Sequence, residues 1–320
     1  KLRVSADGAK LIVANAKGFG SGPNGGADAD KDPRGTYIGN LMNGTVSVMN
    51  IPPDSALAAE TKTVVDNNFR FIAPDAPELA WRRTNPIPSF PGAKESPIRH
   101  IVYVVKENRT YDEIFGQVKG GRGDTALARY GTGRTLQGAD GTVYHDLSIM
   151  PNHQKLASRF AMCDNFYCDS DVSADGHRWL AGTYPNEWVE VNVASSYGGG
   201  RDPKPVSSAP GALAMTGSSG GVYPEDLNEA GTIWDHMERG EVDFFNFGFG
   251  LDQVNSIEDL AFKHTGQRYT VNYPVPAPLY HRTSEEFPTW NMAIPDQFRM
   301  DMFIREFRAR WIGDGKTMPS

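Results

Sequence analysis

Apolar residues alternate with small or polar ones over the first fifty residues, which is the pattern of short β-strands. Residues 2–5 and 10–15 flank Asp7-Gly8, a dipeptide that favours a tight hairpin turn, and a third strand is predicted over residues 44–49. A loop rich in glycine, asparagine, aspartate and proline separates the second and third strands. Its acids do not have the spacing of a calcium-binding loop, so the pattern predicts a small sheet with a solvated connection.

The pattern changes after a proline-rich stretch at residues 74–97. Residues 98–105, with the sequence Ile-Arg-His-Ile-Val-Tyr-Val-Val, are dense in β-branched apolar side chains, which is typical of a buried parallel strand. A polar run follows at once, and residues 111–116 then predict a short helix that ends at a glycine. Ligands of open α/β sheets bind beyond the carboxyl ends of strands, so the polar run occupies the position of a site.

Helical spacing recurs in the second half of the chain. Helices are predicted over residues 151–166, with Leu156 and Phe160 on one face, and over residues 231–239, with a strand at residues 242–247. Residues 194–221 are rich in glycine, serine and proline and predict a long surface insertion. An apolar stripe predicts a packed C-terminal helix, on which Glu306 and Arg310 form an i,i+4 pair. The stripe consists of Met300, Phe303, Ile304, Phe307 and Trp311.

Length and charge narrow the class of protein. The 320 residues are enough for one large domain or two ordinary ones. A net charge of −7 argues against a nucleic-acid-binding surface, whereas a bound metal can reverse the local sign for a phosphate ester. No run approaches the roughly 18 apolar residues of a membrane span. The chain begins at Lys1 without a methionine, and we interpret this as an internal cut that removed any export signal.

The two cysteines, Cys163 and Cys168, stand five residues apart. Two cysteines cannot build the usual four-ligand structural zinc site. The spacing is compatible with a small-loop disulfide, which would fit an oxidising compartment, and equally with two buried free thiols. The sequence leaves both alternatives open, as it does the oligomeric state.

The first candidate site is the polar run after residues 98–105. Glu107 and Asn108 supply a carboxylate and an amide oxygen, the hard donors that suit a divalent cation. Arg109 has the planar fork that holds a phosphate group in bidentate fashion. The alternative is an ordinary solvated strand end. His153 is the one scattered histidine that we keep as a further candidate.

The second candidate site, residues 169–177, concentrates three carboxylates, two hydroxyls and an imidazole. A base or a metal would make Ser173 a useful nucleophile by lowering its effective pKa. Asp175 and His177 are placed to act as ligands or hydrogen-bonding partners. The alternative is a helix N-cap and turn, and the two interpretations are compatible, since an anion site at a helix N-terminus has the same geometry.

These clusters resemble two motifs of the phosphoesterase family of bacterial phospholipases C and acid phosphatases. Residues 98–116 resemble its opening motif, a hydrophobic strand, then Glu-Asn-Arg-Ser/Thr-Phe/Tyr-Asp, then Phe/Tyr-Gly. Residues 163–179 resemble the second motif, in which an Asp-Asn-Phe/Tyr segment leads into the nucleophile loop. The family belongs to the alkaline phosphatase superfamily. Some members carry a YVTN-type β-propeller upstream, and residues 1–50 resemble one repeat of it.

The resemblance implies an α/β fold with an alkaline-phosphatase-like central sheet and flanking helices, preceded by a β-propeller remnant. Residues 1–71 would be the C-terminal blade or blades of the propeller, residues 72–97 a proline-rich linker, and residues 98–320 the N-terminal part of a phosphoesterase domain. The family's remaining metal ligands, an Asp-Asp pair and later Asp/His residues, lie downstream. Residues 1–320 alone are therefore expected to be inactive. The family also implies a secreted or periplasmic location.

Individual roles follow from the same resemblance. Glu107, Asn108 and Ser173 match the metal-binding positions, and Ser173 also matches the Ser/Thr nucleophile. His177 matches the histidine of a His-x-Trp segment in the acid-phosphatase branch, whereas Gly176 stands where that branch often has asparagine. The predicted catalytic residues are Ser173 and His177. The predicted substrate-binding residues are Asn108, Arg109, Asp175 and His177.

The implied activity is hydrolysis of phosphate esters with a divalent metal ion, zinc or calcium, through a phosphoseryl intermediate. The substrate would be a small phosphate ester or a phospholipid headgroup, with no nucleic-acid partner and no transmembrane segment. Two alternatives stand beside it. One is a sulfatase or phosphonate hydrolase of the same superfamily, and the other is a catalytically silent, propeller-based binding or surface protein.

Overall fold

The N-terminal residues form an antiparallel sheet, as the alternating pattern predicts. In the computed structural model of the chain, strands β1 (Leu2–Val4), β2 (Lys10–Asn15) and β3 (Thr45–Asn50) lie in the order β1-β2-β3. Asp7 and Gly8 lie in the β1–β2 turn, and Gly8 has a φ of 72°, a conformation that glycine adopts without strain. The predicted hairpin and its third strand are confirmed.

The structure describes a little over half of the 320 residues, in several stretches. These are residues 2–15, 18, 44–69, 77, 86–87, 96–166, 173–182, 184, 186, 228–250, 277–288, 293–313, 315 and 317–319, with the backbone alone for Ala174 and Asp175. The insertion predicted at residues 194–221 and most of the proline-rich stretch lie outside the described residues.

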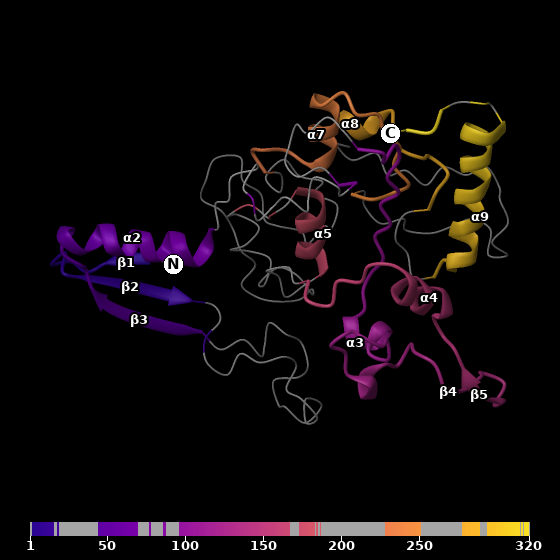
Figure 1. Cartoon of the computed structure of the whole chain (residues 1–320), viewed down its shortest axis with the longest axis horizontal. Coiled ribbons are helices and arrows are strands. Elements are labelled where there is room, and N and C mark those ends of the chain that lie inside the picture. The colour runs from indigo at the N-terminus through magenta and orange to yellow at the C-terminus, as the bar shows by residue number, and fades with distance from the viewer. Residues whose placement is uncertain are drawn as a thin grey trace.

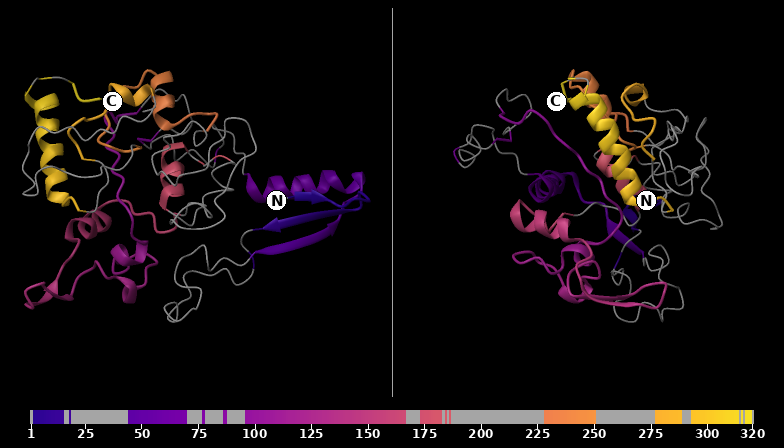
Figure 2. Two further views of the ribbon diagram at one scale, coloured as in Figure 1. Left: turned by 180° about the vertical axis from the view of Figure 1, so that it is seen from behind. Right: turned by 90° about the vertical axis from the view of Figure 1, so that its right-hand side faces the viewer.

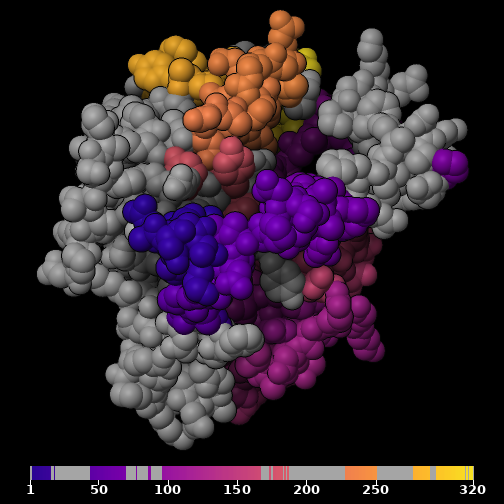
Figure 3. All heavy atoms as spheres, turned by 90° about the vertical axis from the view of Figure 1, so that its left-hand side faces the viewer, coloured from indigo at the N-terminus to yellow at the C-terminus, as the bar shows by residue number. Residues whose placement is uncertain are grey.

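Helix α2 (Asp54–Asn68) follows the sheet and was not predicted. Its sequence is rich in alanine and other good helix formers, it begins after Pro53, and Asp54 places a negative charge at its N-terminus. None of its residues is buried. The sheet and α2 lie together at one end of the molecule (Figures 1 and 3). Residues 1–71 therefore contain a helix beside their strands, and their assignment to a propeller stays a prediction.

Residues 98–105 do not form a strand, contrary to the prediction. They run as a trace without regular structure from near the C-terminus down to helix α3 (Figures 1 and 2). A strand needs neighbours for its backbone hydrogen bonds, and no strand of the described part lies beside these residues. The sheets of the described part are β1–β3 and the hairpin of β4 and β5, so the predicted central sheet stays a prediction.

Residues 111–159 fold as a small unit below that trace. Helix α3 (Tyr111–Phe115) ends at Gly116, as predicted, and is followed by the 3-10 turn η3 (Thr125–Leu127). Strands β4 (Arg134–Gln137) and β5 (Val143–Leu147) form an antiparallel hairpin that the sequence analysis missed.

Helix α4 (Pro151–Arg159) is shorter than the predicted helix over residues 151–166. It packs on α3, where the amide of Gln154 donates a hydrogen bond to the carbonyl oxygen of Ile114. Leu156 and Phe160 are 58% and 63% exposed, so the predicted apolar face does not pack on this unit.

The remaining elements and the loops between them carry most of the buried apolar side chains. They are α5 (Ser173–Gly182), α7 (Ile233–Arg239), α8 (Ala277–Tyr280), α9 (Asp296–Phe307) and the π-helical segment η5 (Arg308–Gly313). Trp234, Phe244 and Leu279 form one cluster, against which Ala181 of α5 packs. Residues 242–247 form no strand, and a parallel bridge joins Asn246 to Thr283 instead. None of the described helices is long and apolar enough to span a bilayer.

The predicted C-terminal helix is confirmed in α9 and η5. Phe303 and Trp311 pack around Phe247, with ring centroids 4.8 and 6.3 Å away, and the predicted pair has Arg310 Nε 2.7 Å from Glu306 Oε1. Met300 is 54% exposed and does not belong to the packed face. The buried positions of α9 are Phe298 and Met302, which pack with Ile294.

Gly116 lies where another part of the chain approaches too closely for a side chain. A β-carbon there would stand 2.3 Å from the carbonyl oxygen of Asp124 and 2.6 Å from that of Asp112. Both contacts are backbone atoms, which cannot turn aside as a flexible side chain can. The glycine at the end of α3 is therefore required by packing.

We expect Gly116→Ala to lower the free energy of unfolding by about 1–3 kcal/mol, the usual cost of forcing extra carbon into a filled space. Gly176→Ala is the matched control, because Gly176 lies inside α5 with no atom within 4 Å of an added β-carbon. That control should be neutral or stabilising by up to about 1 kcal/mol. Urea unfolding of both variants tests this, and equal stability of the two would contradict it.

Candidate active site

The carboxylate of Glu107 connects the two clusters that the sequence analysis singled out. Its Oε2 forms a hydrogen bond with Nε2 of His177, 70 residues further along the chain. The hydroxyl of Ser173 donates a hydrogen bond to the same carboxylate, and Nδ2 of Asn108 lies 3.4 Å from Oε1. The side chains of Glu107 and His177 are 23% and 21% exposed. Four of the predicted residues therefore meet at one partly open site.

Helix α5 places Ser173 and His177 on one face. Ser173 is its first residue and His177 comes four residues later, so their side chains project to the same side, one turn apart. Ala181, on the next turn of α5, packs against the cluster of Trp234, Phe244 and Leu279. The same helix thus carries two site residues and is held by the apolar cluster.

The surroundings of Glu107 favour its charged form. The hydrogen bond from His177 lowers the Glu107 pKa most, and the charge of His177 and the hydrogen bonds from Ser173 and Asn108 lower it further. Partial burial raises the pKa of Glu107, but the combined effect leaves that pKa below its ordinary value of 4.5. Glu107 is therefore a carboxylate at neutral pH, and the two side chains from α5 act as its donors.

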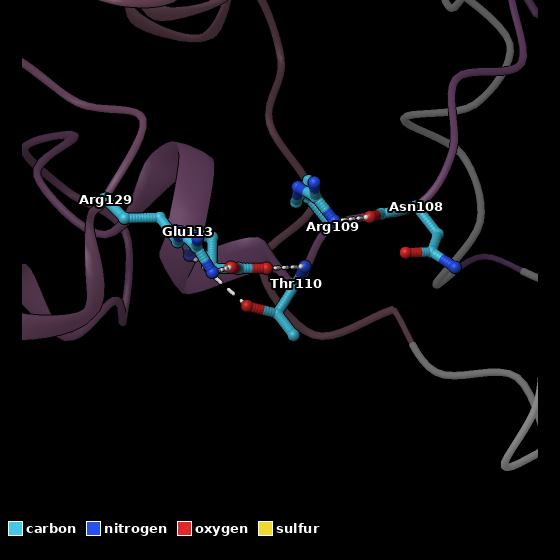
Figure 4. A network of polar contacts seen from close by, with 5 residues as sticks. All are labelled: Asn108, Arg109, Thr110, Glu113 and Arg129. Carbon is cyan, nitrogen blue, oxygen red and sulfur yellow. Dashed lines mark hydrogen bonds and ion pairs between the residues drawn. The ribbon is translucent and has the colours of Figure 1, made fainter. Parts of the chain in front are cut away.

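Asn108 and Arg109 follow Glu107 but face different surroundings (Figure 4). Nη1 of Arg109 donates a 2.9 Å hydrogen bond to the carbonyl oxygen of Asn108, and its guanidinium lies 5.0 Å from the centre of the Tyr130 ring. Arg109 thus contacts neither Glu107 nor His177 in the described structure. Its assignment to phosphate binding stays a prediction.

A capping box ends the loop that carries the site. The Thr110 hydroxyl accepts the backbone N–H of Glu113 at 3.3 Å, and the Glu113 carboxylate accepts the N–H of Thr110 at 3.1 Å (Figure 4). Arg129 holds the other carboxylate oxygen of Glu113 at 3.2 Å. The sequence analysis missed these positioning residues, although Thr-x-x-Glu before an apolar pair is the signal that would have found them.

His153 of α4 lies near the start of the same loop. Partial burial lowers the pKa of its imidazole below 6.5, and the positive charge of Lys106 lowers it further. Lys106 directly precedes Glu107. The histidine kept as a further candidate therefore lies beside the loop that carries the site, in its neutral form at neutral pH.

The predicted metal ligands assemble in part. Glu107 and Ser173 bring oxygen atoms to one place, whereas Asn108 turns its amide nitrogen toward the carboxylate, and oxygen donors are what calcium and magnesium prefer. Among the described residues there is no group of three His, Cys, Asp or Glu side chains that could hold an ion. The side chain of Asp175 lies outside the described residues, so its predicted role is not placed.

Residues 163–166, in the second motif, contact the unit below the site. Asp164 accepts the backbone N–H of Arg122 at 2.8 Å, which gives the acid a structural role. Cys163 is an exposed free thiol and Cys168 lies outside the described residues. The exposure of Cys163 differs from the predicted buried thiol, because the residue precedes a bend at residues 164–165 that lies at the surface.

A comparison with known proteins finds a partial similarity to a phospholipase C. Phospholipase C A of Mycobacterium tuberculosis, from strains CDC 1551 and H37Rv, is 30% identical to the chain over 106 residues. That match spans 32% of this chain and 18% of the relative. No protein-family model matches the chain, and no solved structure matches it.

The similarity supports a likeness to phosphoester hydrolases at the level of the family. Both of these relatives are phospholipase C proteins, so within the phosphoester hydrolases the chain is similar to phospholipase C. None of these comparisons shows a β-propeller.

We expect Glu107→Gln to flatten the acid side of the stability curve of the metal-free protein. Because the Glu107 pKa is lowered in the folded state, its stabilisation is present above the unfolded pKa and is lost as pH falls through the folded pKa. The free energy of unfolding of the unmodified chain should therefore fall more steeply than that of the variant between about pH 5 and 3.

Urea unfolding in the presence of a chelator at several pH values measures this effect. Glu60→Gln, on the exposed helix α2, is the matched control. Parallel pH profiles for Glu107→Gln and the unmodified chain would show that the carboxylate has no such role.

Proposed function

We propose that the chain carries the serine-containing part of a phosphate-ester hydrolase in which Ser173 attacks phosphorus. The observation that supports it most is the shared carboxylate, because Ser173 and His177 both bind Glu107 although they come from a different part of the sequence. A serine nucleophile needs an adjacent base that a third group orients in turn, and here Glu107 is the group adjacent to Ser173 while His177 orients Glu107.

Glu107 orients the nucleophile in this proposal. It accepts the hydroxyl hydrogen of Ser173, so a lone pair of Oγ is left to face a substrate. A carboxylate with a lowered pKa is a weak base, so before the reaction Glu107 positions both donors, and it takes the serine proton only as the bond from Oγ to phosphorus forms. Nε2 of His177 is occupied by Glu107, and Nδ1 has no partner among the described residues. Nδ1 is the ring atom that would serve the leaving group.

The first step forms the bond between Ser173 Oγ and phosphorus and breaks the bond to the leaving oxygen. The serine proton passes to Glu107, and His177 gives its Nδ1 proton to the leaving alcohol. In the second step water attacks the phosphoseryl ester and the bond to Oγ breaks. The water proton goes to Nδ1 of His177, and Glu107 returns its proton to Ser173, which regenerates the starting site.

A divalent cation fits the kind of donor present at this site. Glu107, Asn108 and Ser173 would hold it through oxygen atoms, together with ligands beyond the described residues. When bound, such an ion would neutralise charge on the phosphoryl group. Zinc and calcium are both proposals, and the oxygen donors alone favour calcium.

Phospholipid headgroups and small phosphate esters are the proposed substrates, supported by the similarity to phospholipase C. A secreted or periplasmic location belongs to the same proposal, as do the alkaline-phosphatase-like sheet and the propeller. The matched region spans 18% of the length of that relative, and the activity of the whole protein is therefore part of the proposal.

We expect Ser173→Ala to lower phosphate-ester turnover by at least about a thousandfold, the scale seen when a serine nucleophile is removed. Turnover of p-nitrophenyl phosphate and of a phosphatidylcholine headgroup analogue would be measured on the full product of the gene and on residues 1–320. Residues 1–320 alone should show little or no turnover. Ser158→Ala, on the exposed side of α4, is the matched control and should keep full activity.

The outcomes separate the alternatives. Unchanged turnover in Ser173→Ala, with normal stability, would refute the serine mechanism. Faster hydrolysis of p-nitrophenyl sulfate, measured in parallel, than of p-nitrophenyl phosphate would indicate a sulfatase. No turnover of either ester by the full gene product would favour the binding protein.

We expect the full gene product to bind one class of divalent ion and Glu107→Gln to weaken that binding by about tenfold or more, since a charged ligand is replaced by a neutral one. Calorimetric titration of the chelator-treated protein with calcium and with zinc measures this without reference to activity. Glu60→Gln is again the control. Equal affinity of Glu107→Gln and the unmodified protein would remove Glu107 from the ligand set.

A further inference from the structure

The guanidinium of Arg109 is held by a backbone oxygen and by an aromatic ring. Its Nη1 donates a 2.9 Å hydrogen bond to the carbonyl oxygen of Asn108 (Figure 4), and its central carbon lies 5.0 Å from the centre of the Tyr130 ring. A cation over an aromatic ring is attracted by the negative charge density of the ring face. In the described structure the Arg109 side chain therefore turns back on its own loop.

Tyr130 is anchored to the helix that follows this loop. Its backbone N–H donates a 2.9 Å hydrogen bond to the carbonyl oxygen of Glu113 in α3, and the Glu113 carboxylate accepts the N–H of Thr110. A second cation, Arg129, lies 5.2 Å from the centre of the same ring and 3.2 Å from Glu113 Oε1. The carboxylate compensates the charge of Arg129 and so weakens its repulsion of Arg109.

We propose that Tyr130 is a positioning residue, which holds Arg109 so that the backbone of Asn108 stays fixed beside Glu107. The side chain of Asn108 donates to Glu107 and its carbonyl oxygen accepts from Arg109, so the residue is restrained on two sides. This inference assigns Arg109 to the loop and not to the phosphate group. Its effect on a bound divalent ion rests on the proposed function.

The ring face, and not the hydroxyl, makes the contact with Arg109. Phenylalanine in place of Tyr130 keeps that face, whereas leucine fills a similar space without its negative charge density. Tyr130→Phe should therefore behave like the unmodified chain, and Tyr130→Leu should release Arg109. A variant that only disturbed the packing of the unit would not distinguish a cation from the rest of the fold.

Trypsin cleavage after Arg109 measures the contact on residues 1–320. Trypsin takes the arginine side chain into its own pocket, so a guanidinium that lies over Tyr130 is withheld from it. Tyr130→Leu should speed cleavage of the bond between Arg109 and Thr110 about two- to fivefold, the scale of one exposed cation–π contact, and Tyr130→Phe should not. Cleavage after Arg99 in the same digest, followed by mass spectrometry, is the reference for a general loosening of the fold.

Phe160→Leu is the matched control, because Arg159 lies 5.5 Å from the centre of the Phe160 ring in the same kind of contact. It should leave cleavage after Arg109 unchanged. Equal rates after Arg109 in Tyr130→Leu and in the unmodified chain would overturn the proposal. A rise after Arg109 that is matched by cleavage after Arg99 would overturn it as well.

A double-variant cycle on the full gene product tests the effect on the site. Arg109→Lys keeps the charge but loses the planar fork that lies on a ring and donates to a carbonyl at once. Arg109→Lys, Tyr130→Leu and the double variant should each weaken calcium binding by the same factor, about two- to fivefold, because both residues act through one contact. Calorimetric titration measures this, and Tyr130→Phe should keep the full affinity.

Two results of the cycle would contradict the positioning role. One is a pair of losses that multiply in the double variant, and the other is lost phosphate-ester turnover in Arg109→Lys with normal calcium affinity, which would return Arg109 to phosphate binding. A full gene product that binds no divalent ion would refute the metal site of the proposed function. The trypsin rates would then still decide whether Tyr130 holds Arg109.

Discussion

The carboxylate of Glu107 joins two parts of the chain that no regular element of the described structure connects. Residues 98–110 run without secondary structure, and α5 is held on its far side by the cluster of Trp234, Phe244 and Leu279. The hydrogen bonds from His177 and Ser173 tie the first part to the second. A charged hydrogen bond is stronger than a neutral one, and the polar contact therefore organises the site.

Local contacts fix the path of the chain after Glu107. The capping box of Thr110 and Glu113 starts α3 a few residues after it, and Arg129 holds the free oxygen of Glu113. Gly116 then lets the chain pass close to Asp124. These contacts bind no substrate, yet they decide where the loop before α3 can lie. Much of the motif that resembles the phosphoesterase family is therefore explained by packing, and Glu107 and Asn108 are the part that packing does not explain.

The sequence predicted local features well and long-range pairing poorly. The hairpin at Asp7-Gly8, the glycine end of α3 and the i,i+4 pair of Glu306 and Arg310 depend on residues close together in sequence, and all three are present. The predicted strand at residues 98–105 is absent, because a run of β-branched side chains is only compatible with a strand. Whether a strand forms depends on the neighbouring strands that pair with it. The meeting of Glu107 with His177 could be expected only from the family resemblance, since 70 residues separate them.

Residues 98–105 lie directly before the site at Glu107. The mobility of these residues therefore affects how firmly the site is held. Whatever orders residues 98–105 also limits the motion of the carboxylate that holds Ser173. In the described structure that restraint comes from α3 on one side and from the donors of α5 on the other, with the Tyr103 contact to Phe249 before it. A strand partner would add backbone hydrogen bonds to a stretch that has none within the described part of the chain. Preorganisation of a nucleophile depends on such support, because a site that is correct in composition but loosely held loses most of its advantage.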